Sequence, residues 1–211
     1  MDDRQPTDDD QTDRRPRAAD QPEQAGRRVR ADARRSIDAL LTAAAEVFTA
    51  SGVDAPVRRI TAKAGVGAGT LYRHFPQRSD LIAAVFRHEV DACADAAPAL
   101  ADRHEPVEAL ARWLRRFAGF IATKRGLSAA LHSGDPAYDS LPSYFRQRFV
   151  PVLGTLLTGA AEAGEIRRDA DPEDLLRAVA NLTLPAQDDD GHTERMIALL
   201  IDGLRYGAAS R

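Results

Sequence analysis

Side chains that donate hydrogen bonds to phosphate oxygens are concentrated between residues 57 and 74. Their guanidinium, ammonium, hydroxyl and imidazole groups occupy the positions that the apolar residues of this segment leave free. The residues of this kind are Arg58, Arg59, Thr61, Lys63, Thr70, Tyr72, Arg73 and His74. Contacts to phosphate fix the register of a protein on DNA, so this segment predicts a DNA-binding surface.

The apolar residues of the same segment predict two short helices joined by a tight turn. Val57 and Ile60 share one face of the first helix, and Leu71 and Phe75, four residues apart, share one face of the second. Gly65 is the natural break between them. A short helix held at a fixed angle by a partner fits the major groove of DNA, which is about 12 Å wide.

Small residues open the second helix. Gly67, Ala68 and Gly69 leave no bulk at its N-terminus, so the backbone can approach DNA closely there. Ala68 or Thr70 can contact a thymine methyl group. We therefore expect base-reading or close-approach positions at this end of the helix.

The glycines at 65, 67 and 69 also resemble a nucleotide-binding loop. That loop follows a strand and precedes a longer helix, whereas a helix precedes this one, so the alternative is disfavoured. No nucleophile–base pair or pair of carboxylates predicts catalysis, and we expect no cofactor. His132 lacks partners at metal-ligand spacing, so no metal site is predicted. The single cysteine, Cys93, permits no internal disulfide and is expected to be a buried apolar residue.

A net charge of −3 conceals a basic block. Residues 1–26 carry 4 arginines and 8 acidic residues, residues 27–78 carry 10 basic and 4 acidic residues, and residues 79–211 carry 15 and 20. A basic block inside an acidic chain is typical of a module that binds a polyanion. A solvated charged surface is the alternative that charge alone leaves open.

The remaining sequence has helical periodicity, and we expect an all-α fold of about nine helices without strands. A tail over residues 1–28, rich in Asp, Gln, Pro and Arg, is expected to be disordered. The helices are expected near residues 37–52, 56–64, 67–74, 79–98, 106–124, within 126–137, and at 141–163, 172–184 and 193–207. No apolar run approaches the ~20 residues that span a bilayer, so a cytoplasmic protein without a membrane partner is expected.

From Leu40 to Phe86 the sequence resembles the N-terminal domain of the TetR (tetracycline-repressor) family of bacterial transcriptional regulators. The matched positions are Leu40-Leu41-x-Ala43-Ala44-x-x-Val47-Phe48, Gly52, Ile60-x-x-x-Ala64-Gly65-Val66 and Gly69-Thr70-Leu71-Tyr72-Arg73-His74-Phe75-Pro76-x-Arg78-x-x-Leu81. So many positions over one segment are more specific than any single short motif.

The resemblance implies a homodimer with a helix-turn-helix DNA-binding domain at residues 29–78 and a helical ligand-binding and dimerisation domain at residues 79–211. It implies a repressor that binds a palindromic DNA operator and is released by a small-molecule effector. Carried over position by position, the phosphate contacts are Thr61, Tyr72, His74 and Arg78, with Arg34 and Arg35 leading into the first helix. Gly67, Ala68 and Thr70 correspond to base-reading or close-approach positions.

Beyond about residue 100 only general patterns guide the assignment. Two apolar stripes on the last two helices are candidates for the dimer interface: Leu175, Val179 and Leu182, then Met196, Leu200, Gly203 and Gly207. Ordinary burial within one subunit is the alternative. A ligand pocket is expected between the helices at 106–124 and 141–163. Its candidate residues, each of which also suits a plain core, are Trp113, Phe117, Phe120, His132, Tyr138, Tyr144 and Phe149.

Two other classes of function remain open at this point. A small helical enzyme or lipid-binding protein would need a catalytic constellation or an exposed apolar groove. A transcriptional activator or a DNA-coating protein would carry the same helix pair, and the length and sequence dependence of its DNA footprint would distinguish it.

Overall fold

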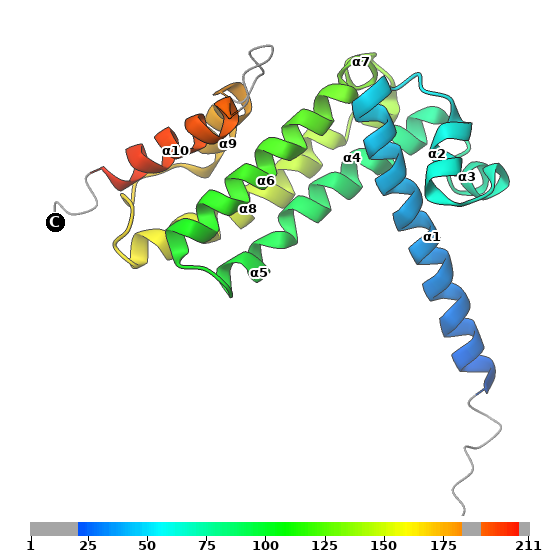
Figure 1. Cartoon of the computed structure of the whole chain (residues 1–211), viewed down its shortest axis with the longest axis horizontal. Helices are drawn as coiled ribbons and strands as arrows, with labels where there is room; N and C mark the ends of the chain where they lie inside the picture. Colours follow the sequence, from blue (N-terminus) through cyan, green and yellow to red (C-terminus); the bar gives the residue numbers. More distant parts are fainter. Residues whose placement is uncertain (1–20, 183–190, 207–211) are drawn as a thin grey trace, which may run out of the picture. The chain divides into compact units, whose positions relative to one another are not determined.

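The computed structural model describes residues 21–182 and 191–206 of the chain. The chain divides into two units, residues 1–37 and residues 38–211. The described residues form ten α-helices and one 3-10 helix, without a strand (Figure 1). The predicted all-α fold is therefore confirmed.

One helix more than expected is present in the described ranges, because the helix predicted from residue 79 to residue 98 is divided in two. Helix α4 spans Arg78–Ala94 and helix α5 spans Ala96–Ala101, with Asp95 between them. Pro98 lies in the first turn of α5 and has no N–H to donate to the carbonyl of Ala94, so the hydrogen-bond ladder is interrupted there.

The first unit contains the beginning of helix α1, which spans Gln21–Ser51 and continues into the second unit. Residues 21–28 are therefore helical, and their assignment to a disordered tail was wrong. The early residues of α1 include Gln, Glu, Ala and Arg, which are good helix formers, and Pro22 falls in the first turn, where proline is tolerated. Residues 1–20 of the predicted tail lie outside the described residues.

The first part of the second unit is a small helical head, which comprises the part of α1 from residue 38, α2 (Val57–Ala64) and α3 (Ala68–His74). Its core consists of the side chains that the periodicity places on one face of each helix. These include Leu40, Ala44, Phe48, Ile60 and Leu71, which are exposed by 2% or less. Burial of this apolar face is what holds three short helices together.

The larger part of the second unit, the body, is built on α4, α6 (Pro106–Gly126) and α8 (Leu141–Glu162). These three helices pack against one another and run side by side in Figure 1. Trp113, Phe117 and Phe149 have no exposed surface and fill the space between them. The ring centres of Phe117 and Phe149 are 5.2 Å apart in an edge-to-face contact, the preferred geometry of aromatic pairs.

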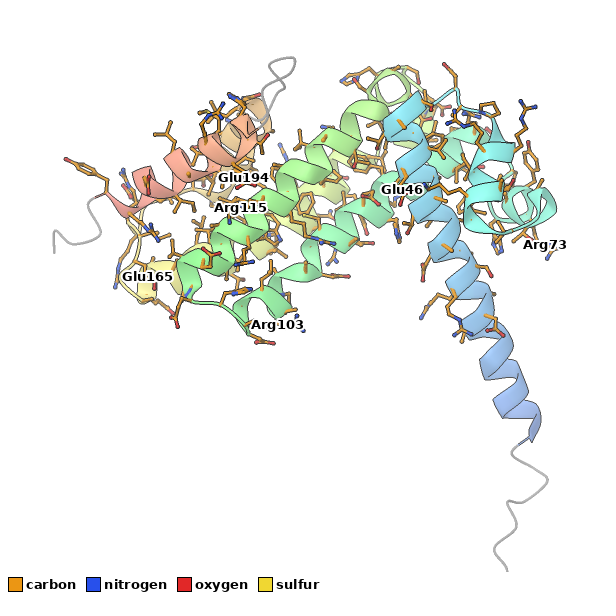
Figure 2. The ribbon with its side chains drawn as sticks, in the orientation of Figure 1. Glu46, Arg73, Arg103, Arg115, Glu165 and Glu194 are labelled. Carbon is orange, nitrogen blue, oxygen red and sulfur yellow. The ribbon has the colours of Figure 1, made fainter. Side chains whose placement is uncertain are left out.

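The remaining elements of the body are α7 (Ser128–Leu131), the 3-10 helix η1 (Pro136–Tyr138), α9 (Pro172–Leu182) and α10 (His192–Arg205). Helix α9 packs on α8 and α6, and α10 packs on α6 and α9. An ion pair joins α6 to α10, with Arg115 Nε 2.6 Å from Glu194 Oε2 (Figure 2). In the residues that the structure describes, no helix has the length and apolar character needed to cross a bilayer.

Candidate nucleic-acid interface and ligand cavity

The turn between α2 and α3 depends on Gly65. This residue has φ of 68°, in the left-handed region that favours glycine, and ends α2. The N–H of Val66 then donates to the carbonyl of Thr61 at 3.1 Å, which closes the end of α2. Gly67 follows in an extended conformation and leads into α3. The chain thus forms a helix-turn-helix, as the apolar spacing predicted.

The beginning of α3 is an open surface. A Cβ atom placed on Gly67 or Gly69 would meet no other atom within 4 Å. Both glycines and Ala68 are exposed, and Thr70 is half-buried. Nothing in the described chain covers the end of the helix that is expected to approach the base edges.

Most of the predicted phosphate contacts are also on the surface. Tyr72 is 54% exposed, so its ring and hydroxyl are accessible from outside the chain. Arg58, Lys63, Arg73 and His74 are exposed as well, and Figure 2 labels Arg73 on α3. The structure therefore places five of these donors where a polyanion can reach them.

Thr61 is buried, although the sequence pattern predicted an exposed position. The sequence placed it on the outer side of α2, but its side chain is buried, with 7% of its surface exposed. Its hydroxyl donates to the carbonyl of Arg58 at 3.3 Å, a bond within its own helix. Thr61 occupies the edge of the apolar face because it follows Ile60 directly, and two adjacent helical positions lie only about 100° apart.

Arg78 has partners within the protein. Its Nε donates to the carbonyl of Val53 at 2.5 Å, its Nη2 also bonds to that carbonyl, and Nη2 donates to the carbonyl of Ala55 at 2.6 Å. The guanidinium also lies 5.7 Å from the ring centre of Phe48. The half-buried side chain thus fastens the loop between α1 and α2, a role that its sequence context did not indicate.

Two other predicted cations have acidic neighbours. Lys63 Nζ lies 2.5 Å from Glu46 Oε2, and both side chains are about half exposed. Arg35 is paired with Asp32 in the first unit, where Arg34 and Arg35 are both exposed. Exposed pairs of this kind hold their partners weakly, so they exchange readily for a phosphate.

A cavity of about 380 Å³ lies in the body. Its walls come from both helices between which a pocket was expected, α6 and α8, and also from α4, α7, η1 and α9. His132 and Tyr138 are the two predicted ligand residues that line it. Phe145, one turn before Phe149 on α8, lines it too and was missed.

The other predicted ligand residues do not line this cavity. Trp113, Phe117, Phe120 and Phe149 are core residues with 5% exposure or less. The indole Nε1 of Trp113 donates to the carbonyl of Cys93 at 3.1 Å, which satisfies its one polar atom. These large side chains fill the body, as the alternative interpretation of their pattern allowed.

Tyr144 belongs to a polar contact between α8 and α4. Its hydroxyl donates to the carboxylate of Asp91 at 2.7 Å, and Arg148 Nε donates to the same carboxylate at 2.7 Å. Burial raises the pKa of Tyr144, and the hydrogen bond to Asp91 raises it further. The phenol therefore stays protonated and serves as a structural donor.

The predicted dimer residues divide into two groups. Leu175 and Val179 are 7% and 0% exposed, so they are buried within the chain itself. Leu182 is 38% exposed, Met196 and Leu200 are half-buried, and Gly203 is exposed. Gly207 lies outside the described residues.

Two large side chains near these residues were missed. Leu199 is 63% exposed and Tyr206 is 84% exposed on or next to α10. Their spacing from Gly203 follows the helical period, so the signal was available in the sequence.

No group of three or more His, Cys, Asp or Glu side chains in the described part of the chain could hold a metal ion. Cys93 is buried, and burial raises the pKa of its thiol to about 12. A thiol with that pKa is almost entirely protonated near neutral pH, so it is a poor nucleophile.

Comparisons with known proteins agree with this geometry. Residues 40–85 match the family described as bacterial regulatory proteins of the tetR family, and residues 105–206 match the SbtR-like transcriptional regulator C-terminal domain. No curated protein matches the sequence.

Solved structures extend the match over most of the chain. A TetR transcriptional regulator of Streptomyces coelicolor is 39% identical with a TM-score of 0.70, over 80% of this chain and 97% of that one. A TetR regulatory protein of Mycobacterium vanbaalenii is 33% identical with a TM-score of 0.66, over 84% and 99%. The chain belongs to the TetR family of bacterial transcriptional regulators, which bind DNA and are not enzymes.

Proposed function

We propose that this regulator is a cytoplasmic homodimeric repressor that binds a palindromic operator and is released by a small molecule in the body cavity. The observation that carries the proposal is that the wall of the cavity includes α4 and the 3-10 helix that packs on it, and that the first residue of α4 is fastened to the head. Tyr138 of η1 lines the cavity, η1 packs on α4, and Arg78 at the first position of α4 fastens the loop that enters the head.

On the DNA, α3 occupies the major groove. Its N-terminus, with Gly67, Ala68 and Thr70, faces the base edges, while Tyr72 and Arg73 contact phosphates on either side. Two such helices in a symmetric dimer bind half-sites separated by about one helical turn, ~34 Å. The exposed residues at the start of α3 support this assignment because bulky groups there would hold the backbone away from the bases.

Release by an effector requires that the cavity and the head share a contact that differs between two states. Burial raises the pKa of Tyr138, Asp135 and Asp80 raise it further, and Arg78 opposes the rise. The charges at the start of α4 therefore act on a residue of the cavity wall. Displacement of η1 by an effector would shift Arg78 and the loop that it fastens. To shift the protein almost completely from its DNA-binding state to its released state, the effector must bind the released state more tightly by about 5.5 kcal/mol.

Dimerisation is supported by the apolar surface on α10. Leu199 and the neighbouring Tyr206 are exposed, and Gly203 between them leaves room for a second helix to approach. Large exposed apolar side chains close together, here Leu199 on α10 and Tyr206 just after its end, are typical of an interface between copies. Leu182 at the end of α9 adds to the same kind of surface.

The DNA-binding step is tested by comparing Arg73→Ala with Arg103→Ala in a mobility-shift assay on the DNA beside the protein's own gene. Both variants remove one exposed positive charge, but Arg103 lies in the loop after α5 (Figure 2). If Arg73 contacts a phosphate, Arg73→Ala weakens binding to all sequences. It also lowers the slope of log K against log salt by roughly 0.9.

Arg103→Ala should leave both the affinity and the slope unchanged. Equal effects of the two variants would mean that only the total charge matters, and the placement of α3 on DNA would then be wrong. If no DNA fragment is retarded by the protein even at low salt, the proposed binding to an operator is wrong.

A further inference from the structure

The body cavity combines an apolar lining with cationic side chains. Leu141 and Leu176 are buried residues of its lining, and the ring of Phe145 lies beside them. Three cationic residues also line it: Lys124 of α6, Arg146 of α8 and Arg177 of α9. Among the described residues, Glu173 is the one carboxylate of the lining. The charge of the lining is therefore positive.

Two of these cations have no carboxylate of their own. The described part of the chain places no Asp or Glu oxygen within 4.0 Å of Lys124 Nζ or of the Arg146 guanidinium. Lys124 Nζ instead lies 5.8 Å from the ring centre of Phe145. Arg177 differs, because its Nη1 lies 3.3 Å from Asp174 Oδ1.

Lys124 is half-buried, so part of its hydration is already lost to the apolar surroundings. A cation in that position gains more from an anion than a fully exposed one does, because screening by water is weaker there. Arg146 offers a planar fork of donors that matches a carboxylate or a similar oxyanion. Together the two supply charge and hydrogen bonds that no group of the described chain uses.

We infer that the effector is a small organic anion with an apolar body, whose charged group is bound by Lys124 and Arg146. Its apolar part occupies the lining formed by Leu141, Phe145 and Leu176. The volume of about 380 Å³ is within the usual range for small-molecule sites. This inference rests on the proposed function, because it names the chemical class of the molecule that releases the DNA.

The test uses three compounds with the same ring system and different charge: 1-naphthaleneacetate, 1-naphthaleneacetamide and 2-(1-naphthyl)ethylamine. Binding to the full chain is measured by titration calorimetry in the absence of DNA. The anion is expected to bind at least about tenfold more tightly than the amide, and the amine most weakly. The preference for the anion should shrink as salt is added.

Charge variants locate the site. Lys124→Gln and Arg146→Gln should each reduce the affinity for 1-naphthaleneacetate several-fold while leaving that for the amide nearly unchanged. Arg103→Gln is the matched control, because it removes one exposed positive charge elsewhere and should change neither affinity. The double variant Lys124→Glu, Arg146→Glu should prefer the amine. Circular dichroism establishes that each variant is folded.

Three outcomes would overturn the inference: equal binding of the anion and the amide, equal effects of Arg103→Gln and Arg146→Gln, or no binding of any compound at millimolar concentration. A mobility shift with the same protein separates this result from the proposed function. If the protein binds DNA but does not prefer the anion, the inferred anionic effector is wrong and the proposed DNA binding still stands. Anion binding without any DNA binding defeats the proposed repressor and leaves the anion site standing.

Discussion

At the scale of single residues, Arg78 shows how one side chain can suit two different assignments. From its place after the second helix of the pair, the family resemblance predicted a phosphate contact. In the structure its guanidinium donates to the carbonyls of Val53 and Ala55 and lies beside Phe48. Sequence context alone does not separate these roles, because both require a long cationic side chain at the start of a helix.

Arg78→Ala should therefore destabilise the head. Loss of hydrogen bonds from a charged donor to two carbonyls is expected to lower the free energy of unfolding by about 2 kcal/mol. Chemical denaturation followed by circular dichroism measures this change. Arg58→Ala is the matched control, because Arg58 is exposed on α2 and should alter the salt dependence of DNA binding without altering stability. If Arg78→Ala changed only the salt slope, the loop-fastening role would be wrong.

At the scale of elements, the sequence predicts the head better than the body. Gly65, Leu71 and Phe75 define the helix-turn-helix because a left-handed turn and a four-residue apolar spacing each have few alternatives. In the body, Phe145 and Phe149 lie on the same face of α8 with ring centres 4.8 Å apart. One lines the cavity and the other is fully buried, a difference set by the packing of α4, α6 and α9 around them. Periodicity identifies the face but not how far a cavity extends along it.

Helix α6 ends where it meets the backbone of α1. A Cβ atom on Gly126 would lie 2.7 Å from the carbonyl oxygen of Phe48 and 2.9 Å from the Cα of Thr49. Both are backbone atoms, so the two helices would have to separate. Gly126→Ala should lower the free energy of unfolding by about 1–3 kcal/mol, the usual cost of overpacking. Thermal unfolding and DNA affinity are the measurements.

Gly119→Ala is the control within the same helix, because a Cβ there meets nothing within 4 Å. It should stabilise the protein by roughly 0.5–1 kcal/mol, since alanine is the better helix former. If Gly126→Ala and Gly119→Ala changed the free energy of unfolding equally, the close approach of α6 to α1 would not be the reason for glycine at position 126.

At the scale of the whole molecule, charge and apolar surface are separated along the chain. The basic block spans residues 27–78, whereas the acidic segment over residues 79–211 carries the cavity and the exposed residues of α10. Leu175 and Val179 of the predicted stripe on α9 are buried within the chain itself. A stripe of period 3.6 indicates burial but not whether the partner is in the same chain.

Leu199→Glu should disrupt the homodimer, because a carboxylate would be buried in an apolar contact. Size-exclusion chromatography with light scattering should give the mass of one chain instead of two. Gln147→Glu, an exposed position on α8, adds the same charge and should leave the mass unchanged. A Leu199→Glu protein that remained dimeric would move the interface away from this face of α10.

Trp113 is the one tryptophan of the chain, and it lies fully buried in the body, stacked 5.7 Å from Phe117. Intrinsic fluorescence excited at the red edge of the absorption band consequently originates from a single fluorophore on α6. The emission wavelength is expected to change when water reaches the aromatic core. It is expected to stay constant when only α2 and α3 unfold. An emission shift on addition of a small molecule would thus locate the perturbation in the body.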